Sequence, residues 1–402
     1  MKEERSGIRV LGPLAVYADG FSAYLAGQGY APASAADQLR LMAHLSRWLA
    51  GRGADAAGLT AERVEEFLAE RRGSHARLVS PRALAPMLGF LRGLGVVPAQ
   101  PAPVASTDVD RLLEAYRCYL SGELGLAAGT VRLRLRVARL FLAGLSEPAE
   151  EHLSRLSGGE VTAFVLRECP GRSVSAARTV VTGTRSLLRF LFVSGHLPRP
   201  LAAGVPGVAG WSRTALPRAV HPQVAARLIA SCDPATAVGR RDQAILILLA
   251  RLGLRGQEVA GLRLDDVDWR AGEVVIRGKG HSRDRLPLPA DVGEAVAGYL
   301  RHGRPRSASR QLFLSARAPL APLSASAIRS VVRDACRRAG LPRIGAHRLR
   351  HMTGTEMLRA GASLAEVGQV LRQRTPLVTA NYARADRMAL RTLARPWPGG
   401  QR

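Results

Sequence analysis

The first half of the chain consists of two segments that resemble each other, residues 17–98 and 112–198. A Phe-Leu pair at positions 90–91 of the first segment has its counterpart at positions 190–191 of the second. Apolar residues recur in both segments with the spacing of amphipathic helices, and neither contains a convincing strand pattern. The sequence therefore predicts two similar units of four or five helices each.

Two segments rich in proline punctuate the chain, one over residues 98–107 and one over residues 197–217. Such segments are typical of linkers between folded units. Together with the repeat, they predict three domains, covering residues 1–105, 106–205 and 213–402. The third domain is also expected to be mostly helical, with residues 272–289 forming two short strands around a Gly-rich turn.

The charge of the chain is strongly unbalanced. It has 58 Lys and Arg against 32 Asp and Glu, a net charge of +26. Residues 201–402 alone carry 33 basic and 14 acidic side chains, whereas residues 1–105 carry 12 and 9. This excess indicates a polyanionic partner, most often a nucleic acid, held mainly by the C-terminal half.

One predicted helix of the second unit has a row of arginines. Arg132, Arg136 and Arg139 recur at helical spacing on one face, and the apolar residues Leu133, Val137, Leu140 and Phe141 are expected to share the other face. The row fits a helix that lies against DNA phosphates. A basic face that only contacts water is an equally acceptable interpretation of the same pattern.

The third predicted domain contains a set of residues with a distinctive order. Arg255 follows a predicted buried helix, with Glu258 three residues later, and Lys279 lies in the Gly-rich turn. A helix then carries the sequence His-Arg-Leu-Arg-His from His347 to His351, and Tyr382 follows 32 residues after Arg350. In this order and spacing the set resembles the tyrosine recombinase, or phage integrase, family.

The resemblance covers residues 106–402 and implies a DNA strand-exchange enzyme of a mobile element, with the tyrosine recombinase fold. Residues 106–205 would be its helical, SAM-like core-binding domain and residues 213–402 its catalytic domain. Tyr382 would be the nucleophile, with Arg255, Lys279, His347 and Arg350 also catalytic. By the same resemblance, Glu258 would hold Arg255 in place, His351 would act less directly, and the protein would work as a tetramer on paired double-stranded sites.

The chemistry of these side chains supports the same assignment. A phenol can attack phosphorus and later leave, which stores the phosphodiester bond without an energy cofactor. Two guanidinium groups can stabilise the charge that develops on the non-bridging oxygens. The departing oxygen needs a proton, which lysine can supply and arginine cannot. Lys279 is informative because the chain has only two lysines against 56 arginines.

One position departs from the family pattern. Where the family usually has histidine or tryptophan, nine residues before the tyrosine, this chain has Gln373. Its amide can donate a neutral hydrogen bond but cannot act as an imidazolium. An active or weakly active recombinase is therefore expected. The alternatives are a DNA-binding homologue that has lost turnover and a type IB topoisomerase-like relaxing enzyme.

Other features narrow the expected setting. The four cysteines are scattered, and there is no metal-ligand cluster or nucleotide-binding motif, so neither a metal nor a nucleotide cofactor is expected. No apolar run is long enough for a membrane span, and a cytoplasmic location is expected. Residues 1–105 carry fewer arginines than the second unit and an acidic run, which predicts an accessory module. It would contact either DNA that flanks the core site or a neighbouring protomer, and the acidic run favours the protomer.

Overall fold

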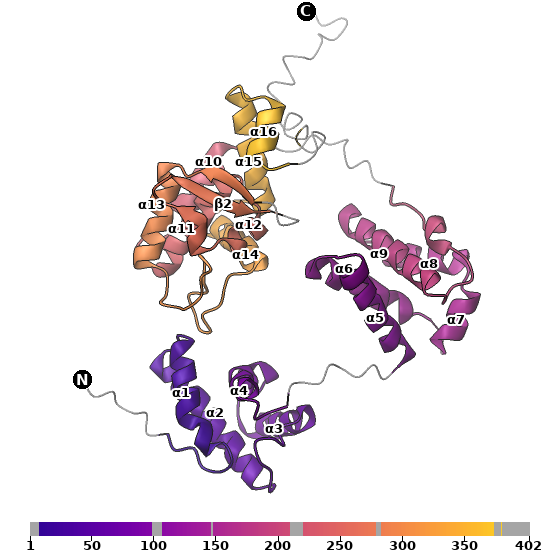
Figure 1. Cartoon of the computed structure of the whole chain (residues 1–402), viewed down its shortest axis with the longest axis vertical. Helices are drawn as coiled ribbons and strands as arrows, with labels where there is room; N and C mark the ends of the chain where they lie inside the picture. Colours follow the sequence, from indigo (N-terminus) through magenta and orange to yellow (C-terminus); the bar gives the residue numbers. More distant parts are fainter. Residues whose placement is uncertain are drawn as a thin grey trace, which may run out of the picture. The chain divides into compact units, whose positions relative to one another are not determined.

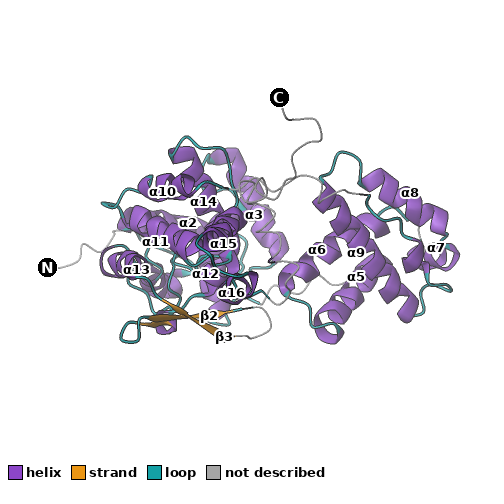
Figure 2. Cartoon of the chain, turned by 90° about the horizontal axis from the view of Figure 1, so that it is seen from above, coloured by secondary structure: helices purple, strands orange, loops and turns teal. Residues whose placement is uncertain are grey.

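A computed structural model describes residues 8–98, 107–145, 148–209, 220–278, 283–373 and Thr379. The described elements are helical apart from one small sheet, which Figure 2 shows in orange. Packing divides the chain into two compact units, residues 100–215 and the combination of residues 1–99 and 216–402. The combined unit has two large hydrophobic cores, one within residues 10–97 and one within residues 220–352.

The N-terminal core is enclosed by four helices. Prolines begin two of them, a position at which the missing N–H has no helical partner to lose, and Thr60 caps a third by accepting a hydrogen bond from the Arg63 amide. The helices are α1 (Ala18–Gly27), α2 (Pro32–Ala50), α3 (Ala61–Ser74) and α4 (Pro81–Gly93), preceded by the short η1 (Ala15–Tyr17).

Residues 100–215 form the other compact unit, whose helices Figure 1 shows in purple to pink. Two of its helices begin with reciprocal caps, Thr107 with Asp110 and Ser157 with Glu160. Its elements are α5 (Asp108–Cys118), η2 (Tyr119–Glu123), α6 (Ala128–Leu142), α7 (Ala149–Arg155), α8 (Gly158–Glu168), α9 (Val174–Val193) and η3 (Leu201–Gly204). Helices α6 and α9 pack closely because Gly183 has no side chain, and a Cβ there would lie 2.8 Å from Cβ of Val137.

The expected apolar face of α6 is wrong at two positions. Val137 and Phe141 are buried, but Leu133 and Leu140 are 45% and 39% exposed. The buried stripe instead runs through Val131, Leu135, Ala138 and Leu142, which lie three or four residues apart. Leu133 and Leu140 fall one position after Arg132 and Arg139, and so they share the exposed face with the arginines.

The C-terminal core surrounds the buried helix α11 (Ala237–Arg251). Around it lie α10 (Pro222–Ala230), α12 (Gly256–Gly261), α13 (Ala290–His302), α14 (Ala325–Arg338), α15 (Ala346–Arg359) and α16 (Leu364–Val370). The antiparallel sheet has the order β1 (Val267–Asp268), β2 (Glu273–Arg277) and β3 (Arg283–Pro287), preceded by η4 (Leu264–Asp266). Val274 of β2 pairs with Val267 and Leu286, which keeps three apolar side chains together.

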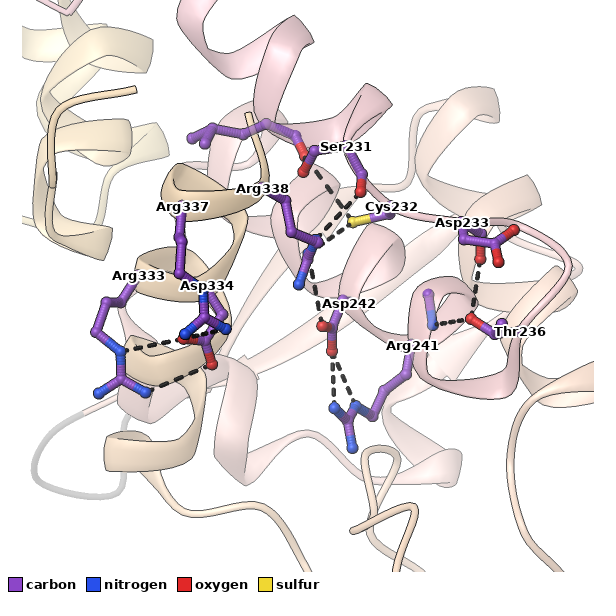
Figure 3. A network of polar contacts seen from close by, with 12 residues as sticks. Ser231, Cys232, Asp233, Thr236, Arg241, Asp242, Arg333, Asp334, Arg337 and Arg338 are labelled. Carbon is purple, nitrogen blue, oxygen red and sulfur yellow. Dashed lines mark hydrogen bonds and ion pairs between the residues drawn. The ribbon is translucent and has the colours of Figure 1, made fainter. Parts of the chain in front are cut away.

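A buried carboxylate links α11 to α14 (Figure 3). Asp242 of α11 is 4% exposed and accepts two hydrogen bonds from Arg241, at 3.1 and 2.8 Å. Arg338 of α14 lies 3.8 Å from the other carboxylate oxygen and donates to the carbonyl of Ser231, just after α10. The negative charge is thus balanced by two guanidinium groups, as burial of a carboxylate requires.

The mainly helical fold class expected from the sequence is confirmed, including the hairpin of β2 and β3. The short helix α12 and the two-residue strand β1 were not foreseen. The division into three domains remains a proposal, with one large hydrophobic core in each expected domain in its favour. Among the described helices, none is long and apolar enough to cross a membrane.

Candidate active site

The segment after α11 carries the first predicted site residue. Arg255 precedes α12, and its backbone N–H donates a 2.8 Å hydrogen bond to Oε2 of Glu258. A glutamate three residues into a helix commonly satisfies the amide at its start in this way. The Arg255 side chain returns to the same carboxylate, with Nη1 donating to Oε1 at 2.6 Å. Glu258 is only 6% exposed, and it orients a guanidinium that reaches solvent.

The second predicted arginine, Arg350, is completely buried in α15. Its Nη1 donates to the carbonyl of Gly253 at 2.7 Å, and its Nη2 donates to the carbonyl of Leu371. The same Nη1 lies 4.0 Å from Oε2 of Glu258. Arg350 is therefore engaged by main-chain oxygens on both of its Nη groups.

Gly253 supplies one of those carbonyls for a clear steric reason. Its φ is +56°, in the left-handed region that glycine adopts without penalty. A Cβ at this position would also lie 2.6 Å from Cδ2 of Leu371. The segment after α11 can therefore lie close to the turn after α16. As a result, the Gly253 and Leu371 carbonyls each accept a hydrogen bond from one Nη group of Arg350.

The turn after α16 contains a residue that the sequence analysis missed. The backbone N–H of Gln373 donates to the Gly368 carbonyl at 2.8 Å, and the backbone N–H of Arg372 donates to the Gln369 carbonyl at 2.9 Å. These two bonds define a Schellman turn, in which the residue at position 372 is usually glycine. Arg372 has φ of +52° there, a conformation that costs a non-glycine residue about 1–2 kcal/mol.

The Arg372 side chain folds back into the site. Its Nη2 donates a 2.8 Å hydrogen bond to Oε2 of Glu258, and Nη1 donates to the carbonyl of Val370 at 2.9 Å. The side chain is 6% exposed. Its own carbonyl accepts from Nη2 of Arg255 at 3.4 Å. The signal available in the sequence was an arginine at a position where a tight turn favours glycine.

The electrostatics of the cluster favour an anionic ligand. Burial raises the pKa of Glu258, but the Arg255 amide and the charges of Arg372 and Arg255 outweigh burial and bring this pKa below its usual value. The carboxylate therefore remains ionised at neutral pH. One negative charge faces the three guanidinium groups of Arg255, Arg350 and Arg372, which leaves an excess of positive charge that suits a phosphate.

The two predicted histidines contact each other on α15. The rings of His347 and His351 are edge to face, with centroids 4.5 Å apart. Desolvation and the charges of Arg350 and Arg255 lower the pKa of His347. Burial, His347 and nearby arginines lower the pKa of His351 to about 4. Both imidazoles are therefore neutral at pH 7, so that His347 can accept a proton.

Gln373 follows the turn and is held by a defined partner. Its Oε1 accepts a 2.8 Å hydrogen bond from the hydroxyl of Thr379, which is buried. The oxygen end of the amide is therefore directed toward Thr379, and Nε2 is its donor end.

Two predicted site residues, Lys279 and Tyr382, lie outside the described residues. The described strand nearest to Lys279 in sequence is β2, which ends at Arg277. Arg277 donates to the buried Asp266 from Nη2 at 2.6 Å and from Nε at 3.2 Å. This pair anchors the end of β2 to η4.

The predicted DNA-binding row is accessible. Arg132, Arg136 and Arg139 are all exposed on α6, interleaved with the exposed Leu133 and Leu140. By contrast, Arg134 faces the neighbouring helix and donates to Ser186 of α9. Among the described residues, no group of three or more His, Cys, Asp or Glu side chains is arranged to hold a metal ion.

Comparison with known proteins adds independent evidence. Residues 218–388 match the model of the phage integrase family, a range that includes the whole candidate site. The integrase/recombinase y4rA of Sinorhizobium fredii is 40% identical over 393 residues, covering 96% of this chain and 95% of the relative. The chain belongs to the phage integrase family. Tyrosine recombinase XerD of Mycobacterium tuberculosis is 30% identical to this integrase, over 71% of this chain and 96% of XerD.

Solved structures agree with the fold of this integrase. The XerH site-specific recombinase bound to a palindromic difH substrate matches with a TM-score of 0.55 and 17% identity, covering 82% of this chain and 93% of XerH. A lambda integrase dimer bound to a COC′ core site matches with a TM-score of 0.54 and 14% identity, over 72% of this chain and 98% of that one. These similarities establish a tyrosine recombinase fold.

Proposed function

We propose that this integrase cuts and rejoins double-stranded DNA at specific sites through a 3′-phosphotyrosyl intermediate formed on Tyr382. The observation that carries the proposal is the convergence of Arg255, Arg350 and Arg372 on the buried carboxylate of Glu258. This arrangement holds excess positive charge beside a solvent-accessible guanidinium. It therefore suits the binding of a phosphodiester and the stabilisation of its pentacoordinate transition state.

In the proposed reaction, the Tyr382 oxygen attacks phosphorus and its proton passes to a base, for which the neutral imidazole of His347 is suited. Arg255 and Arg350 stabilise the non-bridging oxygens, and Gln373 donates a neutral hydrogen bond through its amide. The P–O5′ bond breaks as Lys279 protonates the leaving oxygen. Attack by a 5′-hydroxyl on the phosphotyrosine then reverses these transfers and releases the tyrosine.

We assign DNA contact outside the scissile phosphate to the exposed face of α6. Arg132, Arg136 and Arg139 can neutralise phosphates there, and their exposure supports this assignment. We further propose that copies of the integrase assemble as a tetramer on paired sites of a mobile element. Since the substrate would be cellular DNA, we expect the integrase to act in the cytoplasm.

The test is a suicide DNA substrate with a nick near the cleavage position, which traps the covalent complex. Candidate sites come from the DNA that flanks the gene. Wild-type integrase should form a protease-sensitive adduct on the 3′ side of the break, and Tyr382→Phe should bind the same DNA without forming it. An adduct that persists in Tyr382→Phe would falsify the assignment. Binding without any wild-type adduct would instead favour a DNA-binding homologue.

A further inference from the structure

We propose that Arg372 is a positioning residue of the strand-cleavage site, which keeps both phosphate-binding arginines in register through Glu258 and through its own strained turn. The inference rests on the proposed function. It assigns a role to a residue that lies in sequence between the predicted site residues Arg350 and Gln373, at a position where the turn geometry by itself favours glycine.

First, the Arg372 side chain stands at a backbone position that favours glycine. At φ of +52° a glycine would be free of steric conflict. The arginine is nevertheless 6% exposed, with one Nη group on Glu258 and the other on the Val370 carbonyl. Its long side chain therefore makes specific polar contacts inside the site and does not extend into solvent.

Second, the two carboxylate oxygens of Glu258 accept hydrogen bonds from two different arginines. Oε1 accepts from the Arg255 side chain, whereas Oε2 accepts from the Arg255 backbone amide and from Arg372. With two donors on Oε2, the carboxylate is restrained against rotation about its terminal bond. This restraint fixes the direction in which Oε1 holds the Arg255 guanidinium.

Third, the turn after α16 supplies main-chain hydrogen bonds to both phosphate-binding arginines. The Leu371 carbonyl accepts from Arg350, and the Arg372 carbonyl accepts from Arg255. The side chain of Arg372 fastens this turn to α12 through Glu258. A displaced turn would therefore misplace both guanidinium groups together, and a misplacement of about 1 Å can reduce a reaction rate by about 100-fold.

The test uses the full-length integrase with three substitutions. Arg372→Gly relaxes the backbone and removes the contacts, Arg372→Met removes the charge but retains much of the bulk, and Arg372→Lys retains the charge. The control is Leu78→Gly, which relaxes a second non-glycine residue with positive φ, at +56°, packed against the N-terminal core. Each protein is compared for DNA affinity, single-turnover cleavage at saturating DNA, and melting temperature.

For Arg372→Gly and Arg372→Met we expect cleavage at saturating DNA to fall by about 10- to 100-fold, with DNA affinity changed less than threefold. The melting temperature should stay nearly unchanged in Arg372→Gly, where relief of strain offsets the lost contacts, and should be lower in Arg372→Met, which keeps the strained turn. Arg372→Lys should recover part of the rate, and Leu78→Gly should cleave as wild type does. A loss of affinity with an unchanged saturated rate would overturn the proposal, because Arg372 would then be only a phosphate contact. A rate loss that merely follows a lowered melting temperature would also overturn it.

A second readout is independent of cleavage. Hydrogen exchange of the Arg255 amide, which is bonded to Glu258, should be faster in Arg372→Gly, while amides of α11 and α13 exchange as in wild type. Unchanged exchange at Arg255 would contradict the proposed coupling even if the proposed function holds. An absence of cleavage by the wild-type integrase, combined with faster exchange in the variant, would contradict the proposed function and leave the positioning role supported.

Discussion

Oε1 of Gln373 and the hydroxyl of Thr379 are joined by a 2.8 Å hydrogen bond at the position where the family usually has histidine or tryptophan. The bond gives the amide a fixed direction, with Nε2 as its donor end. A neutral amide stabilises a charged oxygen less than an imidazolium does, because charge-assisted hydrogen bonds are about twice as strong as neutral ones.

We therefore expect Gln373→His to increase the cleavage rate by about tenfold, since a gain of about 1.4 kcal/mol in transition-state stabilisation corresponds to that factor. DNA affinity should change little. Single-turnover cleavage of a suicide substrate provides the measurement, with Thr379→Val as the control for loss of the orienting bond. An unchanged or lower rate in Gln373→His would show that the site is adapted to glutamine.

Lys279 is expected to protonate the leaving 5′-oxygen. Lys279→Arg keeps the positive charge but removes a usable proton donor, so cleavage should fall by about 10²- to 10⁴-fold. A substrate with a 5′-bridging sulfur, whose leaving group needs no proton, should restore the rate of the variant. If the sulfur substrate gave no recovery, Lys279 would be only a phosphate contact.

Gly253 offers a test of the close approach between Gly253 and Leu371, whose carbonyls both bind Arg350. Gly253→Ala places a methyl group 2.6 Å from Leu371 Cδ2 and imposes a positive φ on alanine, which together should destabilise the fold by about 1–3 kcal/mol. Urea unfolding measures the change. Gly261→Ala is the matched control, because its new methyl group meets no atom within 4 Å and its φ is not positive.

His351 predicts a loss of stability in mild acid. Its pKa of about 4 in the folded protein lies below the ordinary value of 6.5, so the unfolded chain binds the proton more tightly. The stabilisation is complete above pH 6.5 and is lost as the pH falls toward 4. The loss should be at most about 2 kcal/mol, because water screens a half-buried ring. Unfolding curves for His351→Gln should lack this part of the pH dependence, and an identical dependence would contradict it.

The arginine row of α6 should be visible in the salt dependence of DNA binding. Replacing Arg132, Arg136 and Arg139 together with glutamine should reduce the slope of log K against log salt by about 2 to 3, since each phosphate contact contributes about 0.9. The control replaces Arg111, Arg117 and Arg155 with glutamine. These substitutions change the net charge equally, but the three arginines are paired with carboxylates. Equal slopes for the two triple variants would mean that the α6 row faces only solvent.

The helices and the site were predictable to different degrees. Helical periodicity sufficed for the helices of the two similar segments. The family resemblance carried by the order of Arg255, His347 and Arg350 implied a shared site in which Glu258 holds Arg255, but not that Arg350 and Arg372 also lie at this carboxylate. The side of α6 occupied by Leu133 was not predictable, because a leucine next to an arginine row fits either face until its partner helix is known. The role of Arg372 was hidden for a similar reason, since a Schellman turn and a contact to Glu258, 114 residues earlier, exist only in the folded chain.

The shared carboxylate also constrains the order in which mutations can accumulate. Once arginine occupies position 372, loss of Glu258 would leave three guanidinium groups without their common counter-ion. Glycine at position 372 would leave Glu258 beside two arginines and would relax the backbone, so its expected cost falls on cleavage and not on folding. The fold therefore tolerates a change at position 372 while Glu258 remains, whereas a change at Glu258 costs more stability when arginine occupies position 372. The two positions are expected to evolve as a pair with a preferred sequence of steps.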